Sequence, residues 1–363
     1  MTTPAIPLPV LITALAVTGV LCATMVLLVV AVKTGREVQA RRRANLLAPY
    51  RQDLIVVSAG EDHDDASMRR LAGATGIAAA VVDDAIVGLL GKIRGAPAEA
   101  LVRLLVDRGK VAEALSDLSR PARGRRARAA HLLGMCRQSR AVPHLVAALG
   151  DKAGEVRAHA AHALGMIGDA AGARPVLRAV GATDPGVPAG IAAAALLSMG
   201  VEIADALRAG LADPDPRSRT VAARVSGAGS FVRSRPRLRA LLADDHDLTT
   251  RTACAEALGM IGGRDDVAAL GRHTQADAPL PLRRTCATAL GELGEPAGLP
   301  ALTTLLDDPD PRLAELAAAA MLRLSPQTVH DLAAARGVRD QDPRRGHPLE
   351  AAIVMARLHG AIG

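Results

Sequence analysis

The stretch VRAHAAHALGMIG at residues 156–168 recurs closely as TRTACAEALGMIG at 250–262 and as LRRTCATALGELG at 282–294. The first Gly of this motif falls at 134, 165, 200, 227, 259 and 291, and Leu322 takes its place in a last copy. A repeat of about 31 residues indicates a solenoid, in which each unit buries its apolar face only against its neighbours. The chain is therefore predicted to be all-α, with each unit a pair of packed helices.

Each unit carries local signals for two helices. An Asp before the first helix can accept hydrogen bonds from its free N–H groups. Gly is expected to close that helix in the left-handed conformation. Pro143, Pro175, Pro236 and Pro300 open second helices, where Pro costs no hydrogen bond. Stacked Ala residues explain how a chain with one Phe and no Trp can form a core.

These units resemble HEAT repeats, in particular the short bacterial HEAT-like repeats of phycobilin lyases. The resemblance covers residues 97–340 and depends on Asp or Asp-Pro before the first helix, Arg near its start, and the run Ala-Ala-x-Ala-Leu-Gly-x-Ile-Gly. It implies an α-solenoid of HEAT-like helix pairs. Such solenoids mostly present binding surfaces to other proteins.

An apolar run precedes the repeats. Residues 8–32 contain no charged side chain, and 25 helical residues at about 1.5 Å each span the roughly 30 Å of a bilayer core. We therefore predict a single transmembrane helix at 8–32. No Lys or Arg precedes the run, and no small-x-small cleavage site follows it, which argues against a cleaved signal.

Most of the net charge of +7 lies beside this run, because residues 33–51 hold six basic residues and Glu37. By the positive-inside rule the N-terminus is predicted outside and the solenoid in the cytoplasm, as a single-pass protein of the cell membrane. Anionic lipid headgroups are the expected partner of this basic segment. The candidate headgroup contacts are Lys33, Arg36, Arg41, Arg42 and Arg43.

The remaining chain divides into four predicted segments. A basic juxtamembrane segment at 33–60 is followed by a helical cap or adaptor at 66–96. The HEAT-like solenoid occupies 97–340, and a capping helix occupies 343–363. End caps are expected because terminal repeats need cover for their apolar faces.

The sequence contains no catalytic or metal-ligating constellation. Cys254 and Cys286 occupy positions that hold Ala in other copies, as expected of small buried residues. His159 and His162 are three apart on one helix, but no His-Glu dipeptide occurs, whereas iron-binding HEAT hydroxylases carry repeated His-Glu pairs. We predict no enzyme activity, no cofactor, no metal and no small-molecule substrate.

Arginines fall into two groups. One group stands eight residues before the repeat Gly, and we interpret it as a structural column that pairs with Asp residues between repeats, such as Asp215, Asp247 or Asp277. Its members are Arg126, Arg157, Arg219, Arg251 and Arg283. The other group departs from the repeat and lies on second helices, which line the concave face in this fold. These candidate partner-binding residues are Arg174, Arg178, Arg208, Arg237 and Arg239.

Three classes of function remain. The favoured one is a membrane-anchored scaffold or adaptor that binds a protein partner, itself a candidate membrane protein. Anchored repeat proteins of this kind accompany membrane glycosyltransferases, which implies a polysaccharide-synthesis complex as one setting. Nucleic-acid binding is the alternative, disfavoured because Tyr50 and Phe231 are the only aromatics for base stacking. A lyase-like enzyme is the second alternative.

Overall fold

The structure, a computed structural model, describes residues 8–182, 186–335, 348–349 and 353. The chain forms two compact units, Met1–Lys110 and Val111–Gly363. The described residues are helical, with turns between the helices and no strand among them. The capping helix predicted at 343–363 lies almost entirely outside the described residues.

The first unit is built around a long N-terminal helix. Its elements are α1 (Leu8–Leu47), a short 3-10 turn (Ala48–Tyr50), α2 (Arg51–Ala59), α3 (Ala66–Ala72), α4 (Gly76–Leu90) and α5 (Ala96–Asp107). Helix α1 lies near the N-terminus and is long and apolar enough to cross a membrane. Its described side chains from Val17 to Val32 are exposed where they are apolar and large. At about 1.5 Å per residue its 40 residues extend about 60 Å.

Ion pairs hold the smaller helices of this unit together. The Nε atom of Arg70 on α3 donates to Asp53 on α2 at 2.9 Å. Arg108, directly after α5, binds the carboxylate of Asp83 on α4 and the carbonyl of Leu71 on α3. Because Asp83 is buried, this contact fixes three helices around one charge.

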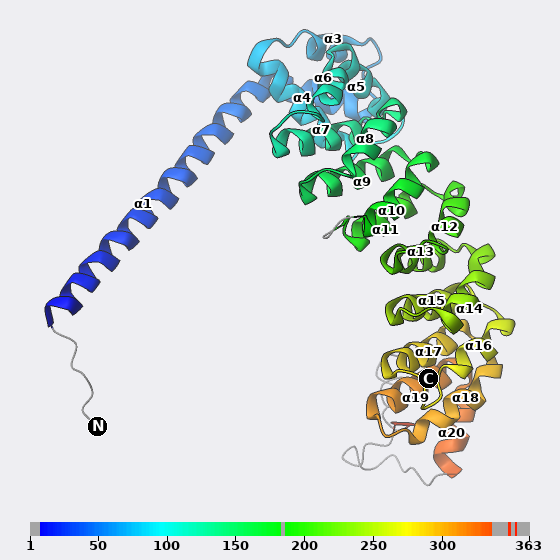
Figure 1. Cartoon of the computed structure of the whole chain (residues 1–363). Coiled ribbons are helices and arrows are strands. Elements are labelled where there is room, and N and C mark those ends of the chain that lie inside the picture. Colours follow the sequence, from blue (N-terminus) through cyan, green and yellow to red (C-terminus); the bar gives the residue numbers. More distant parts are fainter. Residues whose placement is uncertain (1–7, 183–185, 336–347, 350–352, 354–363) are drawn as a thin grey trace. The chain divides into compact units, whose positions relative to one another are not determined.

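The second unit is a stack of helix pairs (Figure 1). It begins with α6 (Lys110–Asp117), and from α7 to α20 the described helices form seven pairs. The first helices are α7 (Arg123–Met135), α9 (Gly154–Ile167), α11 (Ala189–Ser198), α13 (Pro216–Ala228), α15 (Leu248–Ile261), α17 (Leu280–Leu293) and α19 (Pro311–Leu324). The second helices are α8 (Val142–Ala148), α10 (Ala173–Gly181), α12 (Ala204–Gly210), α14 (Arg235–Asp244), α16 (Val267–Arg272), α18 (Leu299–Thr304) and α20 (Pro326–Ala335).

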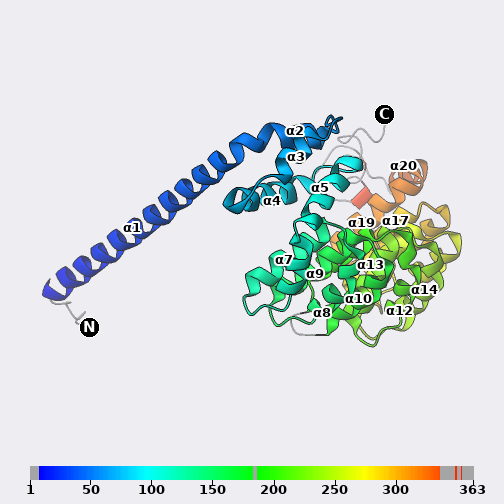
Figure 2. The same cartoon turned by 90° about the horizontal axis from the view of Figure 1, so that it is seen from above.

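First and second helices form two layers, with second helices such as α10, α12 and α14 on one side of α9 and α13 (Figure 2). The core between them is aliphatic, and Leu133, Leu164 and Leu196 are fully buried at equivalent places. Asp side chains cap several first helices as predicted. Asp215, for example, accepts a hydrogen bond from the backbone N–H of Arg217 at 2.7 Å.

Five of the six motif glycines lie inside first helices and do not close them, so that prediction is wrong for these five. Gly165 and Gly259 lie inside α9 and α15 and are buried. A Cβ atom on Gly165 would stand 2.6 Å from the Cα of Ala195, and one on Gly259 would stand 2.9 Å from the Cα of Ala289. Only Gly leaves room for the next helix at these positions. After the first helices, positive φ angles occur at Gly168, Gly200 and Gly294, and also at Arg137 and Ser230.

This geometry also changes the register of the third repeat. Gly165 packs against Ala195, just as Gly227 packs against Ala257, so Ala195 and Ala257 are equivalent. Leu197 therefore occupies the position of the motif Gly, and Gly200 matches the left-handed Gly168. With Leu197 in place, the repeat spacing runs only from 30 to 32 residues.

Candidate functional site

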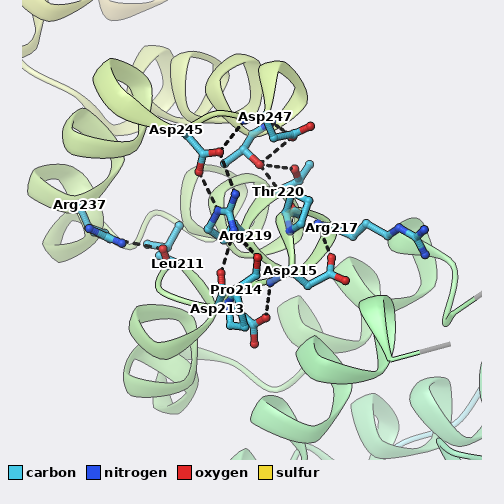
Figure 3. Close-up of polar contacts among 12 residues, drawn as sticks. Leu211, Asp213, Pro214, Asp215, Arg217, Arg219, Thr220, Arg237, Asp245 and Asp247 are labelled. Atoms are coloured by element: carbon cyan, nitrogen blue, oxygen red, sulfur yellow. Dashed lines mark hydrogen bonds and ion pairs between the residues drawn. The ribbon is translucent and has the colours of Figure 1, made fainter.

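Two arginines of the column form the same clamp between neighbouring repeats. Nε and Nη2 of Arg219 donate to the two carboxylate oxygens of Asp245 at 2.7 and 2.8 Å (Figure 3). Its Nη1 donates to the carbonyls of Asp213 and Pro214, which precede its own helix. Arg126 binds Asp151 in the same manner, at 2.6 and 2.9 Å. Such paired donation fixes both the distance and the orientation of successive first helices.

The clamps shift the pKa values of the groups involved. Burial alone would raise the pKa of Asp245, but the hydrogen bond from Arg219 and one from the N–H of Asp247 outweigh it and hold the pKa below its usual range. The hydrogen bond to Asp245 raises the pKa of Arg219 in turn. Both groups therefore stay charged at neutral pH.

The other three column residues make different contacts. Arg283 binds the carboxylate of Asp308 and donates to the carbonyl of Thr274. Arg157 donates to the carbonyls of Asp151 and Lys152. Arg251 bonds to the carbonyl of Leu242 and lies 3.3 Å from Nδ1 of His273.

The predicted Asp partners of the column are wrong. Asp215 and Asp247 cap α13 and α15, and the clamp instead uses the Asp two residues earlier in the chain, as Asp245 does for Arg219. Arg283 likewise pairs with Asp308 and not with Asp277. Two Asp residues stand close together before these first helices, and only the fold assigns one to the cap and the other to the clamp.

The five candidate partner-binding arginines all lie on second helices, and they differ in what they contact. Arg174 and Arg178 on α10 are exposed, and their side chains make no hydrogen bond or ion pair with another described residue. Arg208 on α12 pairs with Asp205 at 2.8 Å in an exposed contact. Arg237 on α14 donates to the carbonyl of Leu211 at 3.3 Å.

Arg239 belongs to a buried cluster that the sequence did not suggest. Asp266 is fully buried, accepts from Nε of Arg235 at 2.8 Å and lies 3.3 Å from Nε of Arg239. It also accepts from the N–H of Gly263. The positions equivalent to Asp266 in other repeats hold small residues such as Gly172 and Gly298. A carboxylate at a position that is otherwise small is the sequence signal that could have revealed this cluster. Arg239 thus has an internal partner.

The candidate headgroup residues share one helix. Lys33, Arg36, Arg41, Arg42 and Arg43 all lie on α1, directly after the apolar run. The described side chains among them, Lys33 and Arg41–Arg43, are exposed.

Three histidines gather on α7 and α9. The rings of His131 and His159 meet edge to face, with centroids 6.3 Å apart. Burial, and then the nearness of His159 and His162, lowers the pKa of His131. Among the described residues, no group of three His, Cys, Asp or Glu side chains is arranged to hold a metal ion.

The described cysteines of the repeats are buried free thiols, as predicted for Cys254 and Cys286. Burial raises the pKa of Cys136, Cys254 and Cys286 to about 12 in each case. A thiol with so high a pKa is a poor nucleophile at neutral pH.

A hollow of about 500 Å³ opens in the second unit where α11, α13 and α15 begin. Its walls include Val187, Pro188 and Val221, and Arg217 and Arg224 stand at its edge. A smaller hollow of about 330 Å³ lies between α15, α17 and α19 and is lined by side chains such as Glu256, Arg284 and Glu292.

Family models match most of this stack. The model of HEAT repeats matches residues 110–198 and 204–281, and the model of the PBS lyase HEAT-like repeat matches residues 282–308. This chain contains HEAT repeats. None of the curated proteins compared with it matches the chain.

Solved structures match this chain to different degrees. A mutant of the karyopherin Kap121p is 13% identical with a TM-score of 0.53, covering 74% of this chain and 34% of that one. Human deoxyhypusine hydroxylase in complex with glycerol is 22% identical with a TM-score of 0.29, covering 69% and 100%. The complex of CpcE and CpcF of phycocyanin lyase from Nostoc sp. PCC7120 is 20% identical with a TM-score of 0.28, covering 67% and 94%. The likeness to the Kap121p mutant concerns the fold alone.

Proposed function

We propose that this HEAT-repeat protein is a membrane-anchored scaffold that holds a protein partner against the surface of its solenoid. The observation that carries the proposal is the two-layer stack of the second unit, which leaves the outer faces of its helices exposed along seven described pairs. HEAT-repeat folds commonly bind proteins. A binding role without catalysis is part of the proposal.

The anchor in this proposal is the apolar part of α1. Large apolar side chains such as Leu21, Leu27 and Val30 are more than half exposed, which is costly in water and favourable in a bilayer. Insertion with the basic segment inside would place the solenoid in the cytoplasm.

The continuous helix narrows the set of headgroup contacts. Headgroups extend about 5–8 Å beyond the hydrocarbon on each side. At about 1.5 Å per residue, Lys33 and Arg36 fall within the headgroup layer if the hydrocarbon core ends near Val32. Arg41, Arg42 and Arg43 stand about 14–16 Å beyond Val32 on an upright helix. We therefore assign direct lipid contact to Lys33 and Arg36, and only longer-range attraction to the other three.

On the second-helix surface, the proposal gives the main role to Arg174 and Arg178. They are four residues apart on α10, so their side chains lie on one face, and neither is engaged by another described residue. Arg208 and Arg237 could add to this surface, whereas Arg239 is held by Asp266. A membrane glycosyltransferase of a polysaccharide-synthesis complex is one candidate partner.

The test is membrane fractionation followed by affinity capture of the full-length protein in mild detergent. We expect the protein to stay with membranes through an alkaline wash and to retain one protein in stoichiometric amount. Arg174→Glu with Arg178→Glu should weaken that retention, whereas Arg312→Glu, an exposed change on α19, should not. A protein removed by the alkaline wash, or one that retains no protein, would contradict the proposal.

A further inference from the structure

Helix α11 differs from the other first helices. It has 10 residues where α9, α15 and α17 each have 14, and its sequence AGIAAAALLS carries no charge. In the register set by Leu197, Ala189 stands where Arg126 and Arg219 form clamps. No guanidinium of α11 therefore ties this helix to the next repeat.

The hollow of about 500 Å³ lies beside the start of α11, where this clamp is missing. Its volume is in the range of pockets that bind small ligands or side-chain anchors. The walls come from the end of α10, the start of α11 and the first half of α13. The apolar lining consists of Val180, Val187, Pro188, Ala189, Pro216 and Val221.

Two arginines, Arg217 and Arg224, stand at the edge of the hollow. Arg217 and Arg224 are seven residues apart on α13, so they lie on the same side of that helix two turns apart. Figure 3 shows the Arg217 side chain extending away from the Arg219 clamp. Arg224 lies 3.5 Å from Glu256, but both side chains are nearly half exposed. Exposed ion pairs of this kind are weak and exchange readily for another carboxylate.

Asp247 is the one carboxylate among the described residues that line the hollow, and it is already engaged. Asp247 accepts hydrogen bonds from the backbone N–H and the hydroxyl of Thr250, at 2.7 and 2.9 Å. The hollow thus combines an apolar interior with two guanidinium groups at its edge, where a carboxylate of a bound partner could pair with them. By contrast, the smaller hollow at α15 and α17 has both Glu256 and Glu292 in its lining.

We infer that this hollow is the anchor pocket of the partner surface, and that it takes an apolar side chain from an acidic polypeptide segment. The inference rests on the proposed function and specifies the chemistry of the partner. Binding surfaces are commonly organised in this way, with a buried apolar anchor and charged residues at the rim that set specificity. The apolar side chain would fill the hollow while a neighbouring Asp or Glu meets Arg217 and Arg224.

The experiment selects binders from a displayed library of random short peptides, using the full-length protein in detergent. We expect the selected peptides to share an apolar residue flanked by Asp or Glu. Thr249→Trp, an exposed change at the mouth of the hollow, should weaken these peptides about tenfold or more. Thr285→Trp at the smaller hollow is the matched control and should leave binding unchanged.

Charge reversal gives a second readout that loss of folding would not produce. With Arg217→Glu and Arg224→Glu together, selection should move from acidic to basic peptides that keep the apolar residue. The inference is overturned if the selected peptides show no acidic and apolar pattern, or if they bind Thr249→Trp as well as the original protein.

Affinity capture separates the two proposals. If the original protein and Thr249→Trp retain the same stoichiometric partner equally well, the pocket assignment fails and the scaffold function stands. If the original protein retains no protein, both fail.

Discussion

The close approach of first helices predicts opposite effects for two identical substitutions. A Cβ atom at Gly165 would lie 2.6 Å from the Cα and 2.9 Å from the Cβ of Ala195, and these are atoms that cannot rotate away. At Gly190, on α11, a Cβ atom would meet no atom within 4 Å. Gly165→Ala should therefore destabilise the protein, and Gly190→Ala should stabilise it.

The magnitude follows from two opposing terms. Overpacking typically costs about 1–3 kcal/mol, and contact with backbone places Gly165→Ala near the upper end, at about 3 kcal/mol. Replacing Gly by Ala within a helix returns about 1 kcal/mol. The net loss is about 2 kcal/mol for Gly165→Ala, against a gain of up to about 1 kcal/mol for Gly190→Ala.

Thermal unfolding followed by circular dichroism, on the full-length protein in detergent, measures the difference. For a unit of this size, about 2 kcal/mol lowers the Tm by about 4–8 °C. Gly190→Ala should raise the Tm slightly. If Gly165→Ala raised the Tm as much as Gly190→Ala, the reasoning from close helix approach would be refuted.

Three further predictions concern charged and reactive groups. Arg219→Ala should lower the free energy of unfolding in urea by about 3 kcal/mol, because it leaves Asp245 buried without its partner. Arg217→Ala, an exposed change, should lower it by at most about 0.5 kcal/mol. Equal losses for the two variants would show that the clamp does not stabilise the protein. The pKa of His131 is lowered in the folded protein, so the unfolded chain binds more protons below about pH 6.5. The free energy of unfolding should therefore decrease as the pH is lowered below that value. His131→Gln should reduce that fall, as measured by urea unfolding at about pH 7.5 and about pH 5.5, and an unchanged pH dependence would argue against the burial of this ring. The thiols of Cys136, Cys254 and Cys286, each with a pKa of about 12, should react with a thiol reagent only on unfolding, unlike the exposed Cys22. Fast labelling of any of these three in the native protein, located by peptide mass spectrometry, would contradict their burial.

The repeat and the helix pairs could be predicted because their signals are local. A period near 31 residues, Asp before first helices and alternating helix signals need no knowledge of contacts. The role of the motif Gly could not be predicted in this way. Close helix approach and left-handed closure both place Gly near the end of a helix, three residues apart as in Gly165 and Gly168. The same ambiguity misplaced Gly200 in the register.

The site depends more on contacts across repeats. The Arg column was visible in the sequence, but its Asp partners lie 25 or 26 residues away beside a second Asp that caps the helix. The buried Asp266 and the hollow beside α11 arise where one repeat departs from the others. The contacts that such departures create can be seen only in the stacked structure.

Affinity capture of the full-length protein beside a variant lacking residues 1–32 tests the central claim most directly. The account predicts that both retain the same stoichiometric protein, and that only the full-length protein is found in the membrane fraction. A partner retained only when residues 1–32 are present would move the binding surface from the solenoid to the apolar helix and contradict the account.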